Sequence, residues 1–434
     1  MSDLDEPELD EQARAILREN DRGGYTVPTA RLYPFQWNWD SAFCALGFAT
    51  FDIDRAFREV ETLVEGQWRG DRNGSANDGM IPHIVFRRPD PDYFPGPDAW
   101  GTHDLHPPGM PTSGISQPPV LGSVLPVLAV QNPERAKPLI EATLRWHAWW
   151  HRARCDEVDD GVVSTIVHPW ESGRDNCPDW DAALDRIVVP DDLPAYTRRD
   201  TSHIDADQRP HRAQYDRYMA IVKFGRDHGW SPDAFRNGPF RVADPGCHFI
   251  LMRAERDLAA LCMTLGIDGA DEALERYRRL RAGCDHLWSR EAGAFVARDA
   301  ASGAMPGAAS SASMLCWYGG AGNALQRERS LQTLRAMLKV EHALPSWHPD
   351  DEAFEAVRYW RGPVWAVVNR MVALGLADEG HADLAARIQR DTRRLIEGAG
   401  FFEYFDPVTG RGLGGDRFSW TAAMWLHWAR EETS

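Results

Sequence analysis

Residues 168–181 read His168-Pro169-Trp170-Glu171-Ser172-Gly173-Arg174-Asp175-Asn176-Cys177-Pro178-Asp179-Trp180-Asp181. Gly173 and Pro178 interrupt any helical or strand period, and Asp and Asn favour turns, so this stretch is predicted to be a loop. Carboxylates bind hydroxyl groups or transfer protons, and indole rings stack on the C–H faces of sugars. The loop therefore suits carbohydrate chemistry, although an Asp-rich surface turn would have the same composition.

The composition of the chain limits the kinds of partner that it can bind. The 434 residues are 43% hydrophobic, which permits the large core of a single big barrel. The 18 tryptophans are many for this length, and several stand beside acids or glycines. A formal net charge of -17 argues against nucleic acid or an anionic membrane as a partner, because both need a basic surface. A local basic pocket for a small anion is compatible with this charge.

The cysteines and the start of the chain indicate a cytoplasmic protein without a metal. The seven cysteines include no C-x-x-C motif, so the sequence indicates neither a disulfide framework nor a zinc site. Residues 1–6 are acidic and lack the apolar core of a signal peptide. The histidines match no metal-binding spacing, and we expect no metal and no cofactor.

Helical periodicity recurs along most of the chain, and strand signals are few. A small hairpin is expected at residues 293–304. Helices are expected at residues 7–20, 40–50, from Asp54 to about 68, and at 117–131, 133–153, 211–228, 245–265, 269–290, 325–339, 362–376, 380–397 and 418–431.

The alternation of long and short connections predicts the architecture. Sequential helix pairs with Gly or Pro at most joints fit a closed ring of helical hairpins, in which the long loops build a site on one rim. We therefore predict an all-α, single-domain (α/α)6 barrel over residues 1–434. An α-solenoid would show a fixed repeat period, and none is found. The irregular segments 70–115 and 182–210 are predicted to be lid-like insertions, and the first is expected to move.

Acids or arginines stand among aromatic residues at four breaks in periodicity. The clusters are Trp37–Asp40, the central loop with Asp175, Tyr359–Trp365, and Phe402–Gly410 with its continuation at 418–421. Structural aromatics fall more often on apolar helix faces. Four such clusters in one chain therefore indicate an enclosed carbohydrate site.

Several motifs together resemble family-63 glycoside hydrolases. They are W-x-W-D-S-A-F from Trp37, S-Q-P-P from Ser116, W-E-S-G-x-D-N-x-P-x-W-D from Trp170, Y-W-R-G-P-V-W from Tyr359, E-Y-F-D-P-x-T-G from Glu403 and F-S-W-T-A-A from Phe418. The chain is most similar to the bacterial branch that hydrolyses 2-O-α-mannosyl- or glucosyl-D-glycerate. The resemblance implies an inverting α-glycosidase, with a small anionic glycoside as its partner.

By this resemblance, Asp175 takes the general-acid position and Glu403 the general-base position. An inverting glycosidase needs its two carboxyl groups about 6.5–9.5 Å apart, which leaves room for the attacking water. The acid also needs a raised pKa, which low-polarity walls such as Trp170 and Trp180 could supply. Of the other acids in the loop, Glu171 either binds hydroxyls or caps a turn, and Asp179 and Asp181 are expected to hold the loop.

The resemblance also assigns substrate-binding residues. Asp40 would bind hydroxyls of the −1 sugar, with helix capping as its alternative role, and Trp37 and Trp365 would be aromatic walls or rim packing. For the glycerate side, Arg209 and Tyr215 are the candidates and Arg212 is a rival. Asp416-Arg417 stands where the branch tends to have Gln, so Arg417 either favours an anion or forms an ion pair. The remaining candidates are Tyr33, His83, Gln117, Gly173, Tyr359 and Trp360.

Three other functions compete with this one. A trehalase-like or α-glucosidase enzyme would cleave a neutral disaccharide, and loss of Arg209 should then matter less. A sugar epimerase would need paired histidines, where this sequence has acids. A sugar-binding protein without activity would not need both Asp175 and Glu403. Helices that carry tryptophans, such as 133–153, are also compatible with a homo-oligomer.

Overall fold

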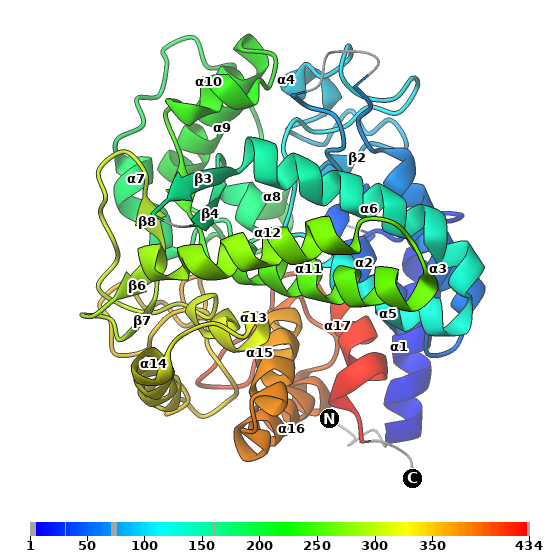
Figure 1. Ribbon diagram of the computed structural model, residues 1–434, viewed down its shortest axis with the longest axis vertical. Coiled ribbons are helices and arrows are strands. Elements are labelled where there is room, and N and C mark those ends of the chain that lie inside the picture. Colours follow the sequence, from blue (N-terminus) through cyan, green and yellow to red (C-terminus); the bar gives the residue numbers. More distant parts are fainter. Residues whose placement is uncertain (1–5, 31, 71–75, 160, 432–434) are drawn as a thin grey trace.

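Contacts between helices close into a ring at the centre of the molecule, and Figure 1 labels these helices. The computed structural model describes residues 6–30, 32–70, 76–159 and 161–431. Neighbouring helices of the inner ring pack on one another, and the last packs on the first. The inner helices are α2 (Asn38–Phe48), α5 (Leu121–Gln131), α11 (Pro245–Leu265), α13 (Cys316–Gly319), α15 (Ala366–Asp378) and α17 (Ser419–Met424).

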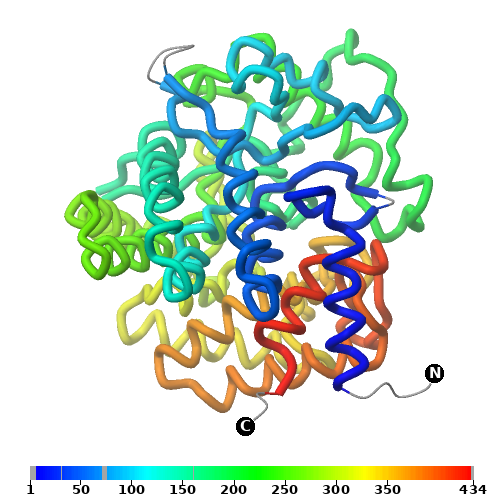
Figure 2. The backbone as a smooth tube through the Cα atoms, turned by 90° about the vertical axis from the view of Figure 1, so that its right-hand side faces the viewer, coloured from blue at the N-terminus to red at the C-terminus, as the bar shows by residue number. Residues whose placement is uncertain are grey.

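A second layer of helices surrounds this ring. Each of α3, α6, α12 and α16 packs on the inner helix that precedes it, while α1 packs on α17. Figure 2 shows the first and last helices side by side, in blue and red. The fold is therefore the expected (α/α)6 barrel. The outer helices are α1 (Glu6–Asn20), α3 (Ile53–Glu65), α6 (Pro133–Ala153), α12 (Ala270–Gly283), α14 (Ala324–Met337) and α16 (Ala382–Ala399).

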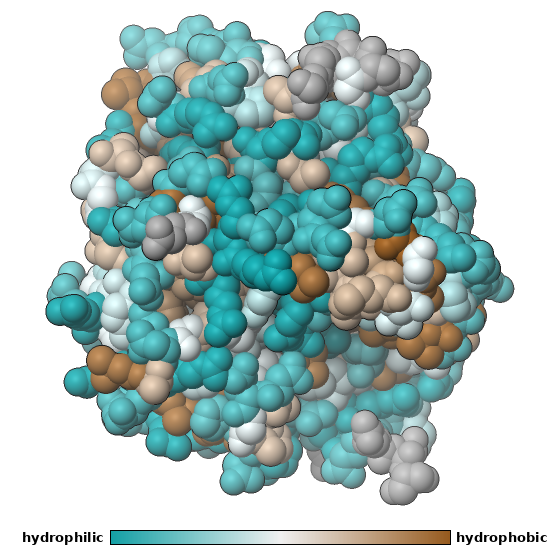
Figure 3. Space-filling model, viewed as in Figure 1, coloured by the Kyte–Doolittle hydropathy of each residue, from teal (hydrophilic) through white to brown (hydrophobic). Residues whose placement is uncertain are grey.

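Burial follows the position of each helix in the two layers. Every residue of α2 and α17 is buried, because an inner helix meets neighbours on all sides. The outer helix α3 buries one face and keeps the opposite face polar. Trp146, Trp149 and Trp150 of α6 are buried in the chain's own core, so they give a homo-oligomer no exposed surface. Figure 3 shows a mainly hydrophilic face over α11 and α12, with hydrophobic groups scattered.

A four-stranded antiparallel sheet supports the central loop, and the sequence did not predict it. Its order is β3 (Cys155–Val158), β4 (Gly161–Ile166), β5 (Val242–Ala243) and β8 (Arg298–Asp299). Every residue of β4 is buried, so this strand lacks the polar–apolar alternation that marks a half-exposed strand. The strand ends directly before His168, where the central loop begins.

Some predicted boundaries were wrong. The hairpin at 293–304 does not form, because β7 (Ala294–Phe295) pairs with β6 (Trp288–Ser289) and β8 pairs with β5. The helix expected from 117 begins at Leu121, after two prolines. The central loop contains the 3-10 turns Pro169–Ser172 and Pro178–Trp180 and the short helix α7 (Asp181–Asp185). None of the described helices is both long and apolar enough to cross a membrane.

The two irregular insertions meet over one end of the ring. The first contains β2 (Ile84–Val85), paired with β1 (Gln36–Trp37), and α4 (Pro97–Trp100). Its residues 71–75 lie outside the described residues. The second contains α8 (Asp200–His203) and leads into α9 (Arg212–Asp227), which is followed by α10 (Pro232–Arg236). Arg199 Nη1 lies 2.8 Å from Asp90 Oδ2, and Phe94 stacks on Tyr196. These contacts join the insertions into a roof, whose movement stays a prediction.

Candidate active site

A cavity lies under this roof, at the N-terminal ends of several inner helices. Its empty volume is about 900 Å³, which includes open solvent at the mouth. The first turns of α2 and α17 reach it, together with the segments before α5 and α15. Of the predicted site residues, it brings together Tyr33, Trp37, Asp40, His83, Gln117, Gly173, Asp175, Arg209, Tyr215, Tyr359 and Glu403.

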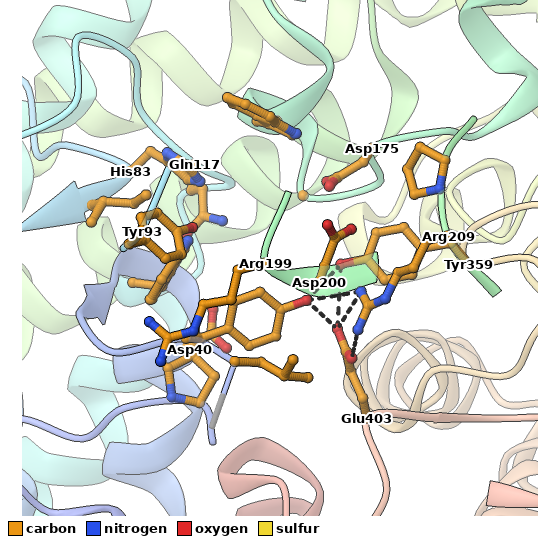
Figure 4. A pocket seen from close by; sticks show the side chains of 18 of the residues that line it. Asp40, His83, Tyr93, Gln117, Asp175, Arg199, Asp200, Arg209, Tyr359 and Glu403 are labelled. Carbon is orange, nitrogen blue, oxygen red and sulfur yellow. Dashed lines mark hydrogen bonds and ion pairs between the residues drawn. The ribbon is translucent and has the colours of Figure 1, made fainter. Parts of the chain in front are cut away.

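Both carboxylate oxygens of Glu403 accept hydrogen bonds, and Figure 4 shows those from side chains. Arg209 Nη2 donates to Oε2 at 2.7 Å, and the Gly415 amide donates to the same oxygen at 3.1 Å. The hydroxyls of Tyr33 and Tyr359 donate to Oε1 at 3.1 and 3.3 Å. Glu403 is 1% exposed. The carboxylate is therefore fixed as an acceptor in one orientation, with one edge toward the cavity.

Asp175 occupies the other side of the cavity. Burial raises the pKa of its carboxyl to about 7, while Arg209 lowers it and Glu403 raises it further. The Tyr218 hydroxyl and the Trp180 indole both donate to the Asp175 carbonyl, at 2.8 and 2.9 Å, and so hold its backbone. A carboxyl with this pKa is protonated in a large fraction of molecules at neutral pH. It can therefore donate a proton.

Gly173 allows a close approach in the loop before Asp175. Its φ is +70°, and a Cβ there would lie 2.6 Å from the Trp39 ring. Any side chain would push the loop away from Trp39. The motif residue is thus needed for the position of Asp175.

The remaining acids of the central loop have structural partners. Glu171 is fully buried against Arg154, so the interpretation as a sugar ligand is wrong. Arg174 bridges Asp179, at 2.7 Å, and Asp244. Asp181 pairs with Arg361. These ion pairs hold the loop on the sheet and on the segment before α15.

Asp40 lies at the opposite wall from Asp175. It is 4% exposed, and burial together with nearby Glu403 raises its pKa well above the usual value. Helix α2 begins at Asn38 with Trp37 as its N-cap residue, so the capping role for Asp40 is wrong. The Gln117 side chain accepts from the Trp39 amide and fixes this turn. Asp40 is therefore available to a polar ligand.

Trp360 and Trp365 do not lie on the cavity wall, which corrects their assignment as substrate contacts. Their rings stack at 3.8 Å, and Trp365 also stacks on Tyr404. The Trp365 indole donates to the carbonyl of Tyr359, whose φ is +40°. The stack lies behind Tyr359 and supports its strained backbone. The aromatic wall itself is formed by Trp37, Trp39, Trp170, Phe418 and Trp420.

The arginines predicted to bind the glycerate carboxylate have other partners in the structure. Arg209 lies in the cavity wall, but it is paired with Glu403. The rival Arg212 is largely exposed and pairs with Asp216, and Arg417 pairs with Glu19. His83 lines the wall as a neutral ring, because burial lowers its pKa well below the usual value.

Among the cavity-lining residues that sequence reasoning missed, three are charged or carry a hydroxyl group. Tyr93 comes from the first insertion, and Arg199 and Asp200 come from the second. Arg198 holds the Asp200 carboxylate at 2.6 Å. The available signals were a tyrosine among prolines at 91–97 and the triplet Arg198-Arg199-Asp200. Both lie in stretches without periodicity, where nothing indicated the direction of a side chain.

Comparison with known proteins shows the family of this chain. A model of the mannosylglycerate hydrolase MGH1-like glycoside hydrolase domain matches residues 33–421. The chain belongs to this family of glycoside hydrolases. The mannosylglycerate hydrolase of Thermus thermophilus is 43% identical, over 96% of this chain and 100% of that protein. The glucosylglycerate hydrolase of Mycolicibacterium hassiacum is 34% identical, over 97% of both.

A solved structure shows the same architecture. A GH63 mannosylglycerate hydrolase from Thermus thermophilus, in complex with Tris and D-glycerate, matches this glycoside hydrolase with a TM-score of 0.89. It is 42% identical and covers 97% of this chain and 100% of that one. The resemblance to family 63 and the expectation of a hydrolase are both confirmed.

Proposed function

We propose that this glycoside hydrolase cleaves 2-O-α-mannosyl- or 2-O-α-glucosyl-D-glycerate to sugar and glycerate, with inversion at the anomeric carbon. The observation that carries this proposal is the unequal pair of carboxyls across the cavity. Asp175 has a pKa of about 7, whereas Glu403 meets an arginine and three neutral donors. The carboxyl that keeps its proton near neutral pH is suited to be the acid, and the carboxylate that is fixed in one orientation is suited to be the base.

The reaction needs one proton given to the leaving oxygen and one proton taken from the attacking water. Asp175 gives its proton to the bridging oxygen, and the C1–O bond breaks with its electrons left on that oxygen. Water attacks C1 from the opposite face and passes its proton to Glu403. The products are the β-anomer of the sugar and D-glycerate. Arg209, Tyr33 and Tyr359 position Glu403 for the water.

The sugar would lie between Asp40 and the aromatic wall. Asp40 is buried at the wall and can accept hydrogen bonds from sugar hydroxyls. Trp37 offers an indole for stacking, and Gln117 lies beside the first turn of α2. Named relatives include hydrolases of both mannosylglycerate and glucosylglycerate, so both sugars belong in the proposal.

The glycerate carboxylate needs a cation, and we assign it to Arg199 together with Arg209 and Tyr215. The Arg209 guanidinium is already bound to Glu403, but its buried Nε has no partner among the described residues. Arg199 lines the cavity mouth with a side chain that is 25% exposed. A guanidinium at the mouth can bind a planar carboxylate through two hydrogen bonds. Asp200, next to Arg199 in the chain, would repel a substrate that carries a second negative group besides the glycerate carboxylate.

A substrate panel tests the proposal. Purified protein is assayed in parallel with mannosylglycerate, glucosylglycerate, the neutral analogue α-glucosylglycerol, trehalose and maltose, and released sugar is measured. We expect release from at least one glycerate glycoside and much slower release from the neutral compounds. The Asp175→Asn variant serves as the blank for contaminating activity. Cleavage of trehalose or maltose without cleavage of either glycerate compound would contradict the substrate class.

A further inference from the structure

A second cavity lies at the opposite end of the barrel from the active site. Arg370 and Leu374 of α15 and Gln389 of α16 line it, with Thr50 after α2. His427 contributes from the π-helical turn Trp425–Ala429. Asp40 lies in the first turn of α2 and Thr50 lies two residues past its end at Phe48, so about 12 Å of helix separates the two cavities. Helical turns of the π type are frequent at functional sites.

Arg370 is a buried cation without an acidic partner among the residues that the structure describes. It is 8% exposed, and burial lowers the pKa of its guanidinium. Nη2 donates to His427 Nε2 at 3.0 Å, and the buried Nε has no acceptor. The buried guanidiniums of Arg154, Arg174 and Arg209 each pair with a carboxylate. Within the described part of the chain, the Arg370 guanidinium therefore has no counter-charge, and its Nε has no acceptor.

The acids nearest this cavity are bound to other arginines. Arg430 and Glu431 both line the cavity, and Arg430 pairs with Asp10 while Glu431 pairs with Arg393 at 2.5 Å. His427 receives the hydrogen bond of Arg370, so its Nε2 carries no proton. Burial and the neighbouring Arg370 lower its pKa to about 3. The cavity thus offers positive charge and no free carboxylate from the described residues.

We propose that this cavity binds a small oxyanion, with Arg370 as its charged ligand and His427 and Arg430 at its sides. An oxyanion in the cavity would supply the missing counter-charge to the guanidinium. Phosphate, sulfate and small carboxylates share this chemistry. The site is separate from the proposed substrate site and does not depend on the proposed function.

The test compares thermal unfolding in different anions. At about 20 mM inorganic phosphate, we expect the Tm of the wild type to rise by about 2 °C relative to chloride at equal ionic strength. The Arg370→Met variant should lose this rise. It should also be at least as stable as the wild type in chloride, because a charge without a partner is removed. Arg394→Met, at an exposed position of α16, should keep the rise.

Two further measurements keep the proposal testable. If Arg370→Met does not fold, Arg370→Lys replaces it, because lysine keeps the charge but lacks the fork of donors. Its phosphate affinity by titration calorimetry should be about tenfold weaker than that of the wild type. Phosphate binding should survive in Arg199→Met, which excludes the active site as its source. Sulfate and acetate, tested in the same way, identify the class of oxyanion.

Three results would overturn the proposal. The first is a wild type that shows no binding to any of these anions. The second is an equal phosphate effect in wild type and Arg370→Met. The third is loss of binding in Arg199→Met alone. Hydrolysis by Arg370→Met should stay within about twofold of the wild type, because Arg370 touches neither proposed substrate nor acid nor base.

Discussion

Arg209 Nη2 lies 2.7 Å from Glu403 Oε2, and both side chains are 1% exposed. Arg209 belongs to the end of the second insertion, whereas Glu403 stands between α16 and α17. The insertion that covers the cavity thus also holds the proposed base. Arg209 thus connects this insertion to the orientation of the carboxylate that is proposed to activate water.

Replacement of either proposed catalytic carboxyl should stop turnover without loss of the fold. Asp175→Asn and Glu403→Gln are each expected to lower kcat by about 10²–10⁴-fold, because proton transfer at one end of the bond is lost. Steady-state kinetics and circular dichroism measure the two effects. Asp185→Asn, at an exposed position of the same segment, is the matched control. A wild-type rate in either variant would refute its role.

The pH dependence should follow Asp175. Its pKa of about 7 means that the acid of the free enzyme loses its proton as pH rises through neutrality, so kcat/KM should fall on the alkaline side of pH 7. The pKa of this carboxyl is raised by folding. Its contribution to stability is therefore fully present below the unfolded pKa of about 4, and it is lost as pH rises through about 7.

This linkage gives a readout that is independent of activity. The Tm of Asp175→Asn minus that of the wild type should increase between about pH 4 and pH 7, because the amide cannot ionise. Asp185→Asn should show a flat difference over the same range. A flat difference for Asp175→Asn would mean that its carboxyl ionises as in water.

Loss of Arg209 should impair all substrates. Arg209→Met leaves Glu403 buried without its cation, so we expect kcat/KM to fall by at least about 100-fold for anionic and neutral glycosides alike. Breaking a buried pair should also cost about 3–5 kcal/mol of stability, measured by denaturant unfolding. Arg212→Met, at an exposed position, is the control. A loss confined to glycerate glycosides would instead assign Arg209 to the carboxylate alone.

Loss of Arg199 should separate anionic from neutral substrates. In Arg199→Met, kcat/KM for the glycerate glycosides should fall by about 10–100-fold, which corresponds to one lost charged hydrogen-bonding partner. Hydrolysis of α-glucosylglycerol, which lacks the carboxylate, should change by less than about twofold. Equal losses for the two substrates would show that Arg199 only holds the roof through Asp90.

The barrel and most of the cavity residues could be predicted from the sequence. Helix periods are local, and the motifs around Trp37, Asp175 and Glu403 stand at the starts of inner helices or in loops beside them. The ring geometry then brings these positions to one rim. Strand β4 could not be predicted from its residue pattern, because a strand that is buried on both faces shows no alternation of polar and apolar residues.

The partners of the charged groups could not be predicted. Arg209 and Glu403 are 194 residues apart, and nothing local indicates that they pair. The stack of Trp360 on Trp365 likewise depends on how the segment before α15 turns at Tyr359. Tyr93, Arg199 and Asp200 stand in irregular insertions, where the direction of a side chain depends on tertiary contacts.

A proton NMR time course of glucosylglycerate and mannosylglycerate hydrolysis tests the proposed chemistry most directly. We expect the β-anomer of the free sugar to appear first, together with glycerate, and the α-anomer to grow later by mutarotation. Initial release of the α-anomer would contradict inversion and make Glu403 a candidate nucleophile. If correctly folded protein releases sugar from neither compound, the proposed substrate is contradicted.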